Sequence, residues 1–335
     1  MPENLRRPGK QDMSGMASVQ QYYSSVWATE RQIAVVQAIR NILNNLVVPS
    51  KNRVMTGNLS NLLSEGLNTS SGDQASPVMP VLFVGHGSPM NAIEENEFAA
   101  GWREMGTRLP RPSAILCVSA HWQSKGTKVT AMEKPETIHD FGGFPRELYE
   151  VQYPAPGSPE LAHTTAATVR ARVVEPDRAW GLDHGAWSVI RRMYPDADVP
   201  VVELSLDYQL SPQQHYDLAR ELAPLRKKGV LIIGSGNMVH NLGLVSWEHM
   251  NTSGYAYDWA LEAGDAMKKS ILGGDHVPLI SYASQGRAFR LAIPTPEHFL
   301  PLLYALALQE PGEPAELFND KPVAGSLTMT SVKIG

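Results

Sequence analysis

The residues of this sequence best suited to chemistry are histidines that follow apolar runs. His86 follows PVLFVG, His121 follows SAILCVSA and His240 follows GVLIIGSGNMV. A neutral imidazole binds zinc or iron through one nitrogen, and it titrates near neutral pH, so it can also act as an acid or a base. One such histidine is usually a polar group with a local hydrogen bond. Three histidines that each follow an apolar run, two of them with glycines nearby, favour a shared reactive site, because glycine lets the backbone approach closely.

The elements that must position these histidines are strands of a sheet. Apolar runs predict buried strands at 80–85, 113–120, 128–132, 199–206 and 229–236, and helical patterns lie at 97–105, 159–172, 211–225 and 255–271. We therefore expect an α/β fold: a single domain with a mainly parallel or mixed central sheet flanked by helices. In such sheets the ligand lies beyond the carboxyl ends of the strands, where all three histidines are predicted.

The remaining histidines divide into two groups. His184, in LDHGAW, lies in a turn before a helix, and His298, in PTPEHFLPLL, opens the last long helix. His163, His215, His249 and His276 fall on helix or loop patterns and are interpreted as surface residues. The sequence has no cysteine pair and no HExxH pattern, which argues against a structural zinc site and a zincin protease.

Composition limits the class of protein. The chain has 335 residues, of which 43% are apolar and 19% charged, so it can bury a sizeable core. A formal net charge of −5 without a dense basic run argues against nucleic acid and an electrostatic membrane anchor as partners. No apolar stretch approaches the ~18 residues of a membrane span. The single cysteine, Cys117, excludes an intrachain disulfide, reads as a core residue and favours a cytoplasmic location.

Residues 1–78 differ from the rest and are expected to be an extension, partly helical or disordered. The first residues are polar, and an apolar stripe from Ile33 to Leu46 predicts a helix within 18–48. The polar stretch NTSSGDQASP then predicts a linker. Because the start lacks an apolar signal-peptide core, we do not expect secretion.

Seven ordered motifs resemble the 4,5-DOPA extradiol dioxygenases of bacterial type, within the class III or LigB-type extradiol ring-cleavage dioxygenase family. They are GHGSPMN, SAHW, HDFGGFP, YPAPGSP, DHGAW, GSGNMVHNL and IPTPEHFLPLL, and the resemblance covers residues 79–335, the expected catalytic domain. It implies a non-haem metal-dependent enzyme of aromatic compound metabolism. Such an enzyme cleaves the ring of L-DOPA or a related catechol with O₂, giving a muconic semialdehyde.

The resemblance also implies a metal site. His86 and His121 correspond to two metal ligands and His298 to the third, although relatives more often use a glutamate there and Glu297 is adjacent. His240 corresponds to the catalytic acid and base, close enough to the metal to count as a fourth ligand. Fe(II) is the expected cofactor for catalysis. Zinc can occupy the same ligands but cannot perform the redox step.

Further residues are implied on the substrate side. His184 corresponds to a second catalytic histidine, and His139, Asp140 and Phe141 of HDFGGFP to residues that bind the substrate. The implied partners are a small catechol and O₂. The oligomeric state stays open, a monomer included.

Two other functions remain open at this point. A metal-dependent hydrolase or a chelatase is one, because GHGS after an early strand also occurs in tetrapyrrole chelatases. A non-catalytic zinc-binding protein on the same scaffold is the other. The SAHW and PTPEH motifs, which chelatases lack, favour the dioxygenase.

Overall fold

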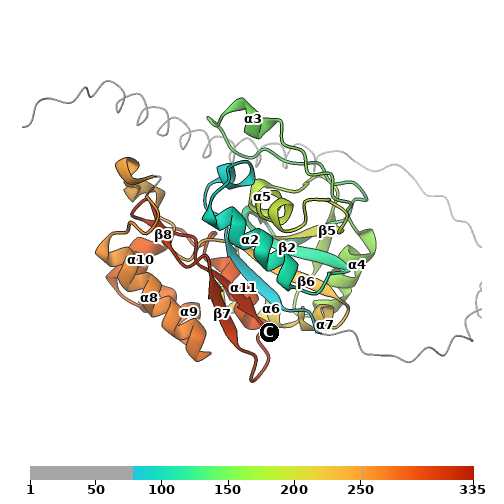
Figure 1. The fold of residues 1–335 in the computed structure, drawn as a ribbon. Helices are drawn as coiled ribbons and strands as arrows, with labels where there is room; N and C mark the ends of the chain where they lie inside the picture. Colours follow the sequence, from blue (N-terminus) through green and yellow to red (C-terminus); the bar gives the residue numbers. More distant parts are fainter. Residues whose placement is uncertain (1–77, 251) are drawn as a thin grey trace, which may run out of the picture. The chain divides into compact units, whose positions relative to one another are not determined.

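A computed structural model describes residues 78–250 and 252–335, which form one α/β unit built on a central sheet (Figure 1). The sheet has eight strands in the order β4-β3-β5-β2-β6-β1-β10-β7. Their bounds are β1 Val81–Gly85, β2 Ala114–Ser124, β3 Thr127–Thr130, β4 Val174–Asp177, β5 Val201–Asp207, β6 Val230–Gly236, β7 Ala315–Phe318 and β10 Ser331–Ile334. A separate pair comprises β8 Pro322–Val323 and β9 Leu327–Thr328.

The sheet is mixed, with a parallel centre. β5, β2, β6 and β1 run parallel to one another, whereas β10 pairs antiparallel with both β1 and β7, and β3 pairs antiparallel with β5. The carboxyl ends of the four central strands therefore share one edge. This arrangement confirms the expected sheet, and it places the sites that follow β1, β2 and β6 next to one another.

Helices connect the strands. They are α2 Glu97–Arg108, α3 Arg146–Tyr149, α4 Pro159–Thr168, α5 His184–Met193, α6 Pro212–Arg220, α7 Ala223–Arg226, α8 Asp258–Gly273, α9 Val277–Ile280, α10 Arg287–Ala292 and α11 Leu300–Ala307. Side-chain oxygens cap several N-termini by accepting backbone N–H groups, as Asn96 does for α2 and Ser158 for α4. At α6, Ser211 and Gln214 form a reciprocal capping box.

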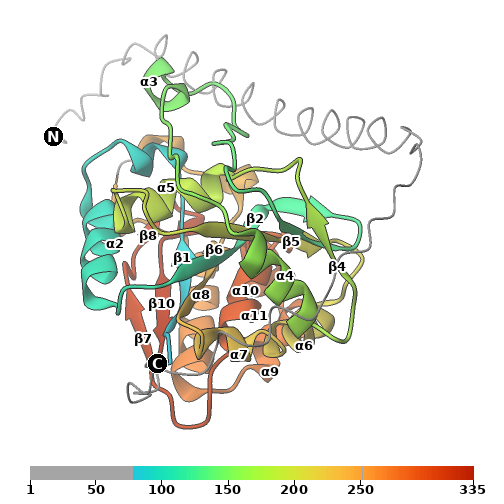
Figure 2. The same cartoon turned by 90° about the vertical axis from the view of Figure 1, so that its right-hand side faces the viewer.

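The two faces of the sheet carry separate apolar layers, because alternate residues of a strand point to opposite faces. Phe83 of β1 and Leu116 of β2 belong to the layer that contains α6, α8 and α11. Leu82 of β1 packs in the opposite layer with α2 and α5. Figure 2 shows the sheet between these helices. Cys117 lies wholly buried in the second layer, so the prediction of a core cysteine is confirmed.

Two elements differ from the predicted ones. β2 continues to Ser124, so His121 lies within a strand instead of after it. The single helix predicted over 211–225 is divided into α6 and α7. The helix and linker predicted within residues 1–77 lie outside the described residues.

One histidine prediction is wrong. His215, interpreted as a surface residue, is completely buried, and its Nδ1 lies 3.0 Å from the Tyr304 hydroxyl of α11. The helical period explains this, because Leu218 and Ala219 of α6 are buried on the same face. His163 is exposed, as predicted, and His249 and His276 are partly exposed.

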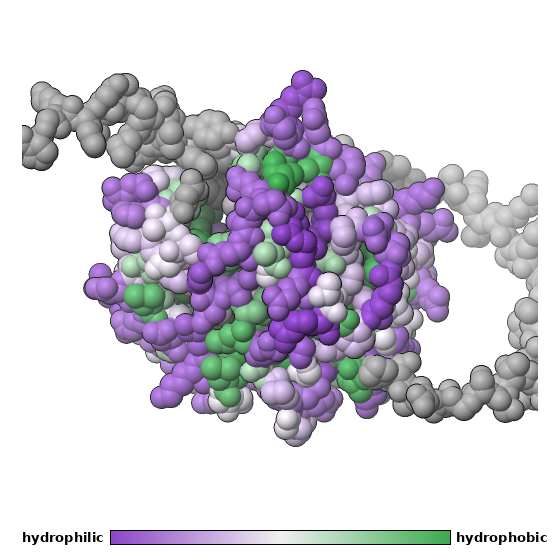
Figure 3. Space-filling model, viewed as in Figure 1, coloured by the Kyte–Doolittle hydropathy of each residue, from purple (hydrophilic) through white to green (hydrophobic). Residues whose placement is uncertain are grey.

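The surface in Figure 3 is largely hydrophilic, with apolar patches between polar regions. Exposed large apolar side chains include Leu244, Leu261, Leu272 and Val277. Within the described residues, no helix combines the length and apolar character needed to cross a bilayer.

Candidate metal centre

Three neighbouring strands and the segment before α11 bring four histidines to the carboxyl edge of the sheet. His86 directly follows β1, His121 lies in β2, and His240 follows β6. β6 lies between β1 and β2, which is why residues far apart in sequence meet. His298 arrives from the other side, two residues before Leu300 begins α11.

The segment that carries His298 is held directly against the end of β6. The Asn237 backbone N–H donates to the His298 carbonyl oxygen at 2.8 Å. A Cβ placed on Gly236 would lie 2.1 Å from that same oxygen, so only glycine allows the approach. The GSG sequence at the end of β6 thus brings His298 to the strand edge.

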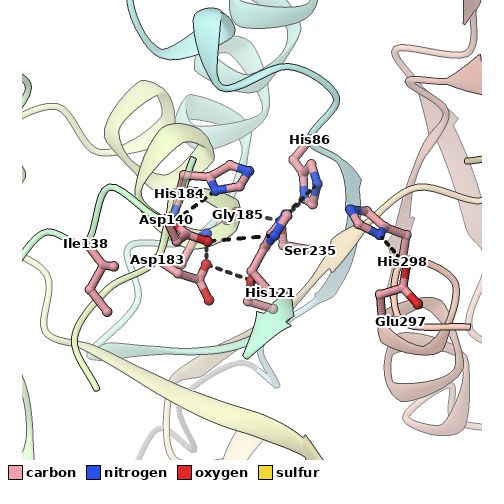
Figure 4. A network of polar contacts seen from close by, with 12 residues as sticks. His86, His121, Ile138, Asp140, Asp183, His184, Gly185, Ser235, Glu297 and His298 are labelled. Carbon is pink, nitrogen blue, oxygen red and sulfur yellow. Dashed lines mark hydrogen bonds and ion pairs between the residues drawn. The ribbon is translucent and has the colours of Figure 1, made fainter. Parts of the chain in front are cut away.

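Three of the rings converge on one point. The Nε2 atoms of His86 and His121 lie 3.3 Å apart, and one ring nitrogen from each of His86, His121 and His298 lies within 4.8 Å of the others. The ring centroids are 5.0 to 5.3 Å apart. Figure 4 shows these rings directed toward one another. Such a donor set can bind one divalent metal ion.

In each of these three histidines Nδ1 faces an oxygen atom, within hydrogen-bond distance for His86 and His298 and at a longer distance for His121. His86 Nδ1 lies 3.0 Å from the Ser235 hydroxyl, which donates its own proton to the Gly185 carbonyl and so accepts from Nδ1–H. His298 Nδ1 lies 3.2 Å from Glu297 Oε1, and His121 Nδ1 lies 3.7 Å from Asp140 Oδ2. Partners at Nδ1 leave Nε2 for a metal, the usual arrangement around metal-binding histidines.

Electrostatics favour uncharged rings here. Burial, together with the neighbouring imidazoles, holds the pKa of His86, His121 and His240 well below the ordinary value. Burial alone would raise the pKa of Glu297, but hydrogen bonds from His298 and Thr295 lower it, so its carboxylate stays ionised. Neutral imidazoles beside a carboxylate are the protonation states that metal binding requires.

His240 lies against His298 and not among the three converging nitrogens. The two rings are stacked, with centroids 3.5 Å apart and planes 9° apart. A second set of ligand atoms within 4.8 Å of one another comprises His240, Glu297 and His298. The His240 backbone is fixed by a 2.9 Å hydrogen bond to the Ala292 carbonyl. His240 therefore lies beside the converging nitrogens, and its ligand group has His298 in common with theirs.

His184 approaches from the opposite side, as the first residue of α5. Its ring centroid lies 3.8 Å from that of His121, and its Nδ1 lies 2.9 Å from Asp140 Oδ1. A third possible ligand set comprises His121, Asp140 and His184. The five histidines and two carboxylates form one continuous cluster.

Residues of the HDFGGFP loop contact two different parts of the structure. Phe141 is buried with its ring 5.5 Å from that of His184, so it lies beside the cluster. His139 instead directs Nε2 to the Val151 carbonyl at 2.9 Å and belongs to none of the possible metal-binding groups of the described residues. The structure thus brings Asp140 and Phe141 to the site but not His139.

Sequence reasoning missed the buried groups behind the cluster. Ser119 donates to Asp183 Oδ1 at 2.7 Å, and the Asp183 N–H donates to Glu203 Oε1 at 2.8 Å. Burial and the nearby Asp140 raise the pKa of Asp183 to about 6, and burial and Asp183 raise that of Glu203 well above its usual value. Only Asp183 had a sequence signal, an acid directly before the helix that begins at His184. Ser235, the partner of His86, was hidden in the apolar β6 sequence.

Comparisons with known proteins agree with this geometry. Residues 79–324 match the model of the catalytic LigB subunit of aromatic ring-opening dioxygenase. The chain is 47% identical over 261 residues to 4,5-DOPA dioxygenase extradiol of Escherichia coli K12, covering 77% of this chain and 95% of the relative. It is 36% identical to the Beta vulgaris protein of the same name, covering 76% and 96%. A crystal structure of an uncharacterized Escherichia coli K12 protein superposes with a TM-score of 0.66 at 42% identity, covering 77% of this chain and all of the other.

Fold and site together define an α/β enzyme with a histidine cluster able to bind a metal ion. The chain belongs to the LigB family of ring-opening dioxygenases, whose members are extradiol dioxygenases and require a metal. The resemblance found in the sequence motifs is thereby confirmed, and so are the enzyme class and the fold.

Proposed function

We propose that this dioxygenase opens the ring of L-DOPA or a related catechol beside the hydroxyl pair, using O₂ and a non-haem Fe(II) ion. The observation that carries the proposal is the convergence of nitrogens from His86, His121 and His298 within 4.8 Å of one another. The names of the Escherichia coli and Beta vulgaris relatives support DOPA as the substrate.

The three converging histidines are the proposed metal ligands, with Glu297 as the partner of His298. The 3.2 Å contact between Glu297 and the His298 Nδ1 supports this assignment over Glu297 as the third ligand. Three imidazoles suit either Fe(II) or Zn(II). Bound there, Fe(II) would supply the redox chemistry and the open coordination positions that ring opening with O₂ requires, whereas zinc would not.

Two histidines are proposed to handle protons. A half-buried, neutral His240 can accept the proton that a catechol hydroxyl loses on binding, and can return it later. His240 is also proposed as a fourth ligand in a resting state, which its ligand group with Glu297 and His298 supports. His184 is the second catalytic histidine, on the opposite side of the site. Of the three residues expected on the substrate side, Phe141 is proposed to line it with Asp140 behind the histidines, whereas His139, directed to the Val151 carbonyl, is not proposed there.

We also propose that residues 79–335 form the catalytic domain and that 1–78 are an extension to it. The match of residues 79–324 to the family supports this division. A chain that begins at Val78 should then equal the full chain in metal content and turnover. The proposed compartment is the cytoplasm, since one cysteine suits a reducing environment.

The experiment is a test of turnover with iron. The full chain is purified without oxygen, loaded with Fe(II) and mixed with L-DOPA or a simple catechol. We expect a yellow semialdehyde to form with one O₂ consumed for each ring opened, and zinc-loaded protein to be inactive. Absence of both colour and O₂ uptake with several catechols would refute the proposal and favour a hydrolase, a chelatase or a zinc-binding protein.

A further inference from the structure

Asp140 lies between two histidines that have different proposed roles. Its Oδ2 lies 3.7 Å from Nδ1 of His121, and its Oδ1 lies 2.9 Å from Nδ1 of His184. The same Oδ1 accepts the backbone N–H of His184 at 2.9 Å. The Asp140 side chain is only 10% exposed, so little water competes for these contacts.

This arrangement differs from the partners of the other two converging histidines. The Ser235 hydroxyl serves His86 and also the Gly185 carbonyl, and Glu297 serves His298 together with the Thr295 hydroxyl. Within the described residues, Asp140 is the only carboxylate whose oxygens lie within 4.0 Å of ring nitrogens of two histidines of the cluster. The two rings it contacts are also packed against each other, with centroids 3.8 Å apart.

We propose that Asp140 is a positioning residue whose carboxylate, 2.9 Å from Nδ1 of His184 and 3.7 Å from Nδ1 of His121, favours the form of both rings that carries its proton on Nδ1. His121 is then left with Nε2 for the metal, and His184 with Nε2 for the substrate. The proposal rests on the proposed function for the role of each ring, but the geometry it describes does not depend on the substrate. Outer partners of this kind contribute about 10- to 100-fold to metal affinity or activity.

Two other roles for Asp140 make different predictions. If its carboxylate bound the substrate, its loss would raise KM and leave metal affinity unchanged. If it only held the loop to the start of α5, asparagine would replace it, because an amide oxygen also accepts the His184 N–H. That same oxygen can also accept from His184 Nδ1, but the amide NH₂ would then face Nδ1 of His121, from which it cannot accept a proton. Asp140→Asn therefore separates these roles.

The first experiment measures zinc affinity of the full chain by competition with a chelator. We expect Asp140→Asn to weaken zinc binding by about 10- to 100-fold with little change in the melting temperature. Asp177→Asn is the matched control: Asp177 also accepts backbone N–H groups, from Ala179 and Trp180, but contacts no histidine of the cluster. It should bind zinc like wild type. Equal zinc affinity in Asp140→Asn and wild type would overturn the proposal.

A second measurement does not depend on whether the variant folds. In the zinc-loaded wild-type protein, two-bond ¹H–¹⁵N spectra report which nitrogen of each imidazole carries its proton. We expect protonated Nδ1 in both His121 and His184, with the His184 signals assigned by their loss in His184→Gln. A proton on Nε2 of His184 would contradict the proposal.

These readouts also separate the proposal from the proposed function. Both use zinc and no substrate, so they stand even if the iron-loaded enzyme consumes no O₂ with any catechol. In that case the proposed reaction fails and the role of Asp140 survives. A wild-type chain that binds no zinc would overturn both.

Discussion

At the scale of single residues, the partners at Nδ1 assign the protons in the cluster. Ser235 accepts from His86, and does not donate to it, because its own proton goes to the Gly185 carbonyl. Glu297 has no proton to give and so accepts from His298. Both rings are therefore left with Nε2 as a lone-pair donor, which is the state that binds a metal.

His240→Ala tests the proposed acid and base. Removing a proton-transfer group that is not an essential ligand should lower kcat by about 10²- to 10⁴-fold and leave one iron per chain. The measurement pairs steady-state turnover of catechol with metal content of the same preparation. Full activity would exclude the role, and loss of the iron together with activity would assign His240 to the ligands.

The candidate histidines could be predicted from the sequence, but their partners could not. His86 and His121 stand out because a polar residue follows an apolar run, and strand order brings such ends together. Ser235 lies inside an apolar strand, where a serine carries no signal of its own. Glu297 was visible beside His298, but only the 3.2 Å contact with Nδ1 supports a partner role over a ligand role.

At the scale of elements, the site depends on how closely α11 and its leading segment approach β6. A Cβ on Gly234 would lie 2.2 Å from the Pro301 carbonyl oxygen of α11, and one on Gly236 would lie 2.1 Å from that of His298. Both contacts involve backbone atoms, which cannot turn away as a side chain can. The two glycines thus set the distance between the strand and His298.

Gly236→Ala should therefore damage both stability and the metal site. The added methyl must displace the segment carrying His298, at a cost of about 1–3 kcal/mol in the free energy of unfolding. Zinc affinity should fall as well. Gly264→Ala, in the interior of α8, is the control, because nothing lies within 4 Å of its added Cβ and alanine favours a helix by up to about 1 kcal/mol. Urea unfolding and chelator competition on both variants measure these effects, and unchanged values for Gly236→Ala would refute this account of β6.

Strands and helices were predictable to different degrees for a physical reason. β1, β5 and β6 are buried along their whole length, as is β2 up to Ala120, and the apolar starts of these strands made them predictable, although β5 also buries Glu203 and Ser205. β10 has the short sequence SVKI, and it joins the sheet because β1 and β7 lie on either side of it, which no local pattern reveals. Leu218 and Ala219 mark the inward face of α6 in the sequence, but only the packing of α11 on that face shows that His215 is buried there.

At the scale of the whole molecule, the interior contains two kinds of titratable group, histidines and carboxyl groups, whose pKa values are shifted by burial. Burial lowers the pKa of His215 to about 4, and burial with neighbouring imidazoles lowers that of His86, His121 and His240. Asp183 and Glu203 shift the other way, because burial and nearby carboxylates favour their protonated forms. The two kinds have opposite effects on stability as pH changes.

The metal-free protein should lose stability as pH falls from about 7.5 to 5.5. Below pH 6.5 the unfolded chain protonates histidines that the folded chain keeps neutral. Each such histidine therefore lowers the free energy of unfolding by about 1.4 kcal/mol per pH unit. For His215 this continues down to about pH 4, its pKa in the folded chain. Asp183 and Glu203 have the opposite effect on stability. Below about pH 6 the folded chain keeps a proton on Asp183 that the unfolded chain has lost, and the raised pKa of Glu203 acts in the same direction. Because four histidines outnumber the two acids, the net effect of acidification should be a loss of stability. Urea midpoints of chelator-treated protein measure the slope, which His215→Gln should make shallower, and a midpoint that rises on acidification would contradict the prediction.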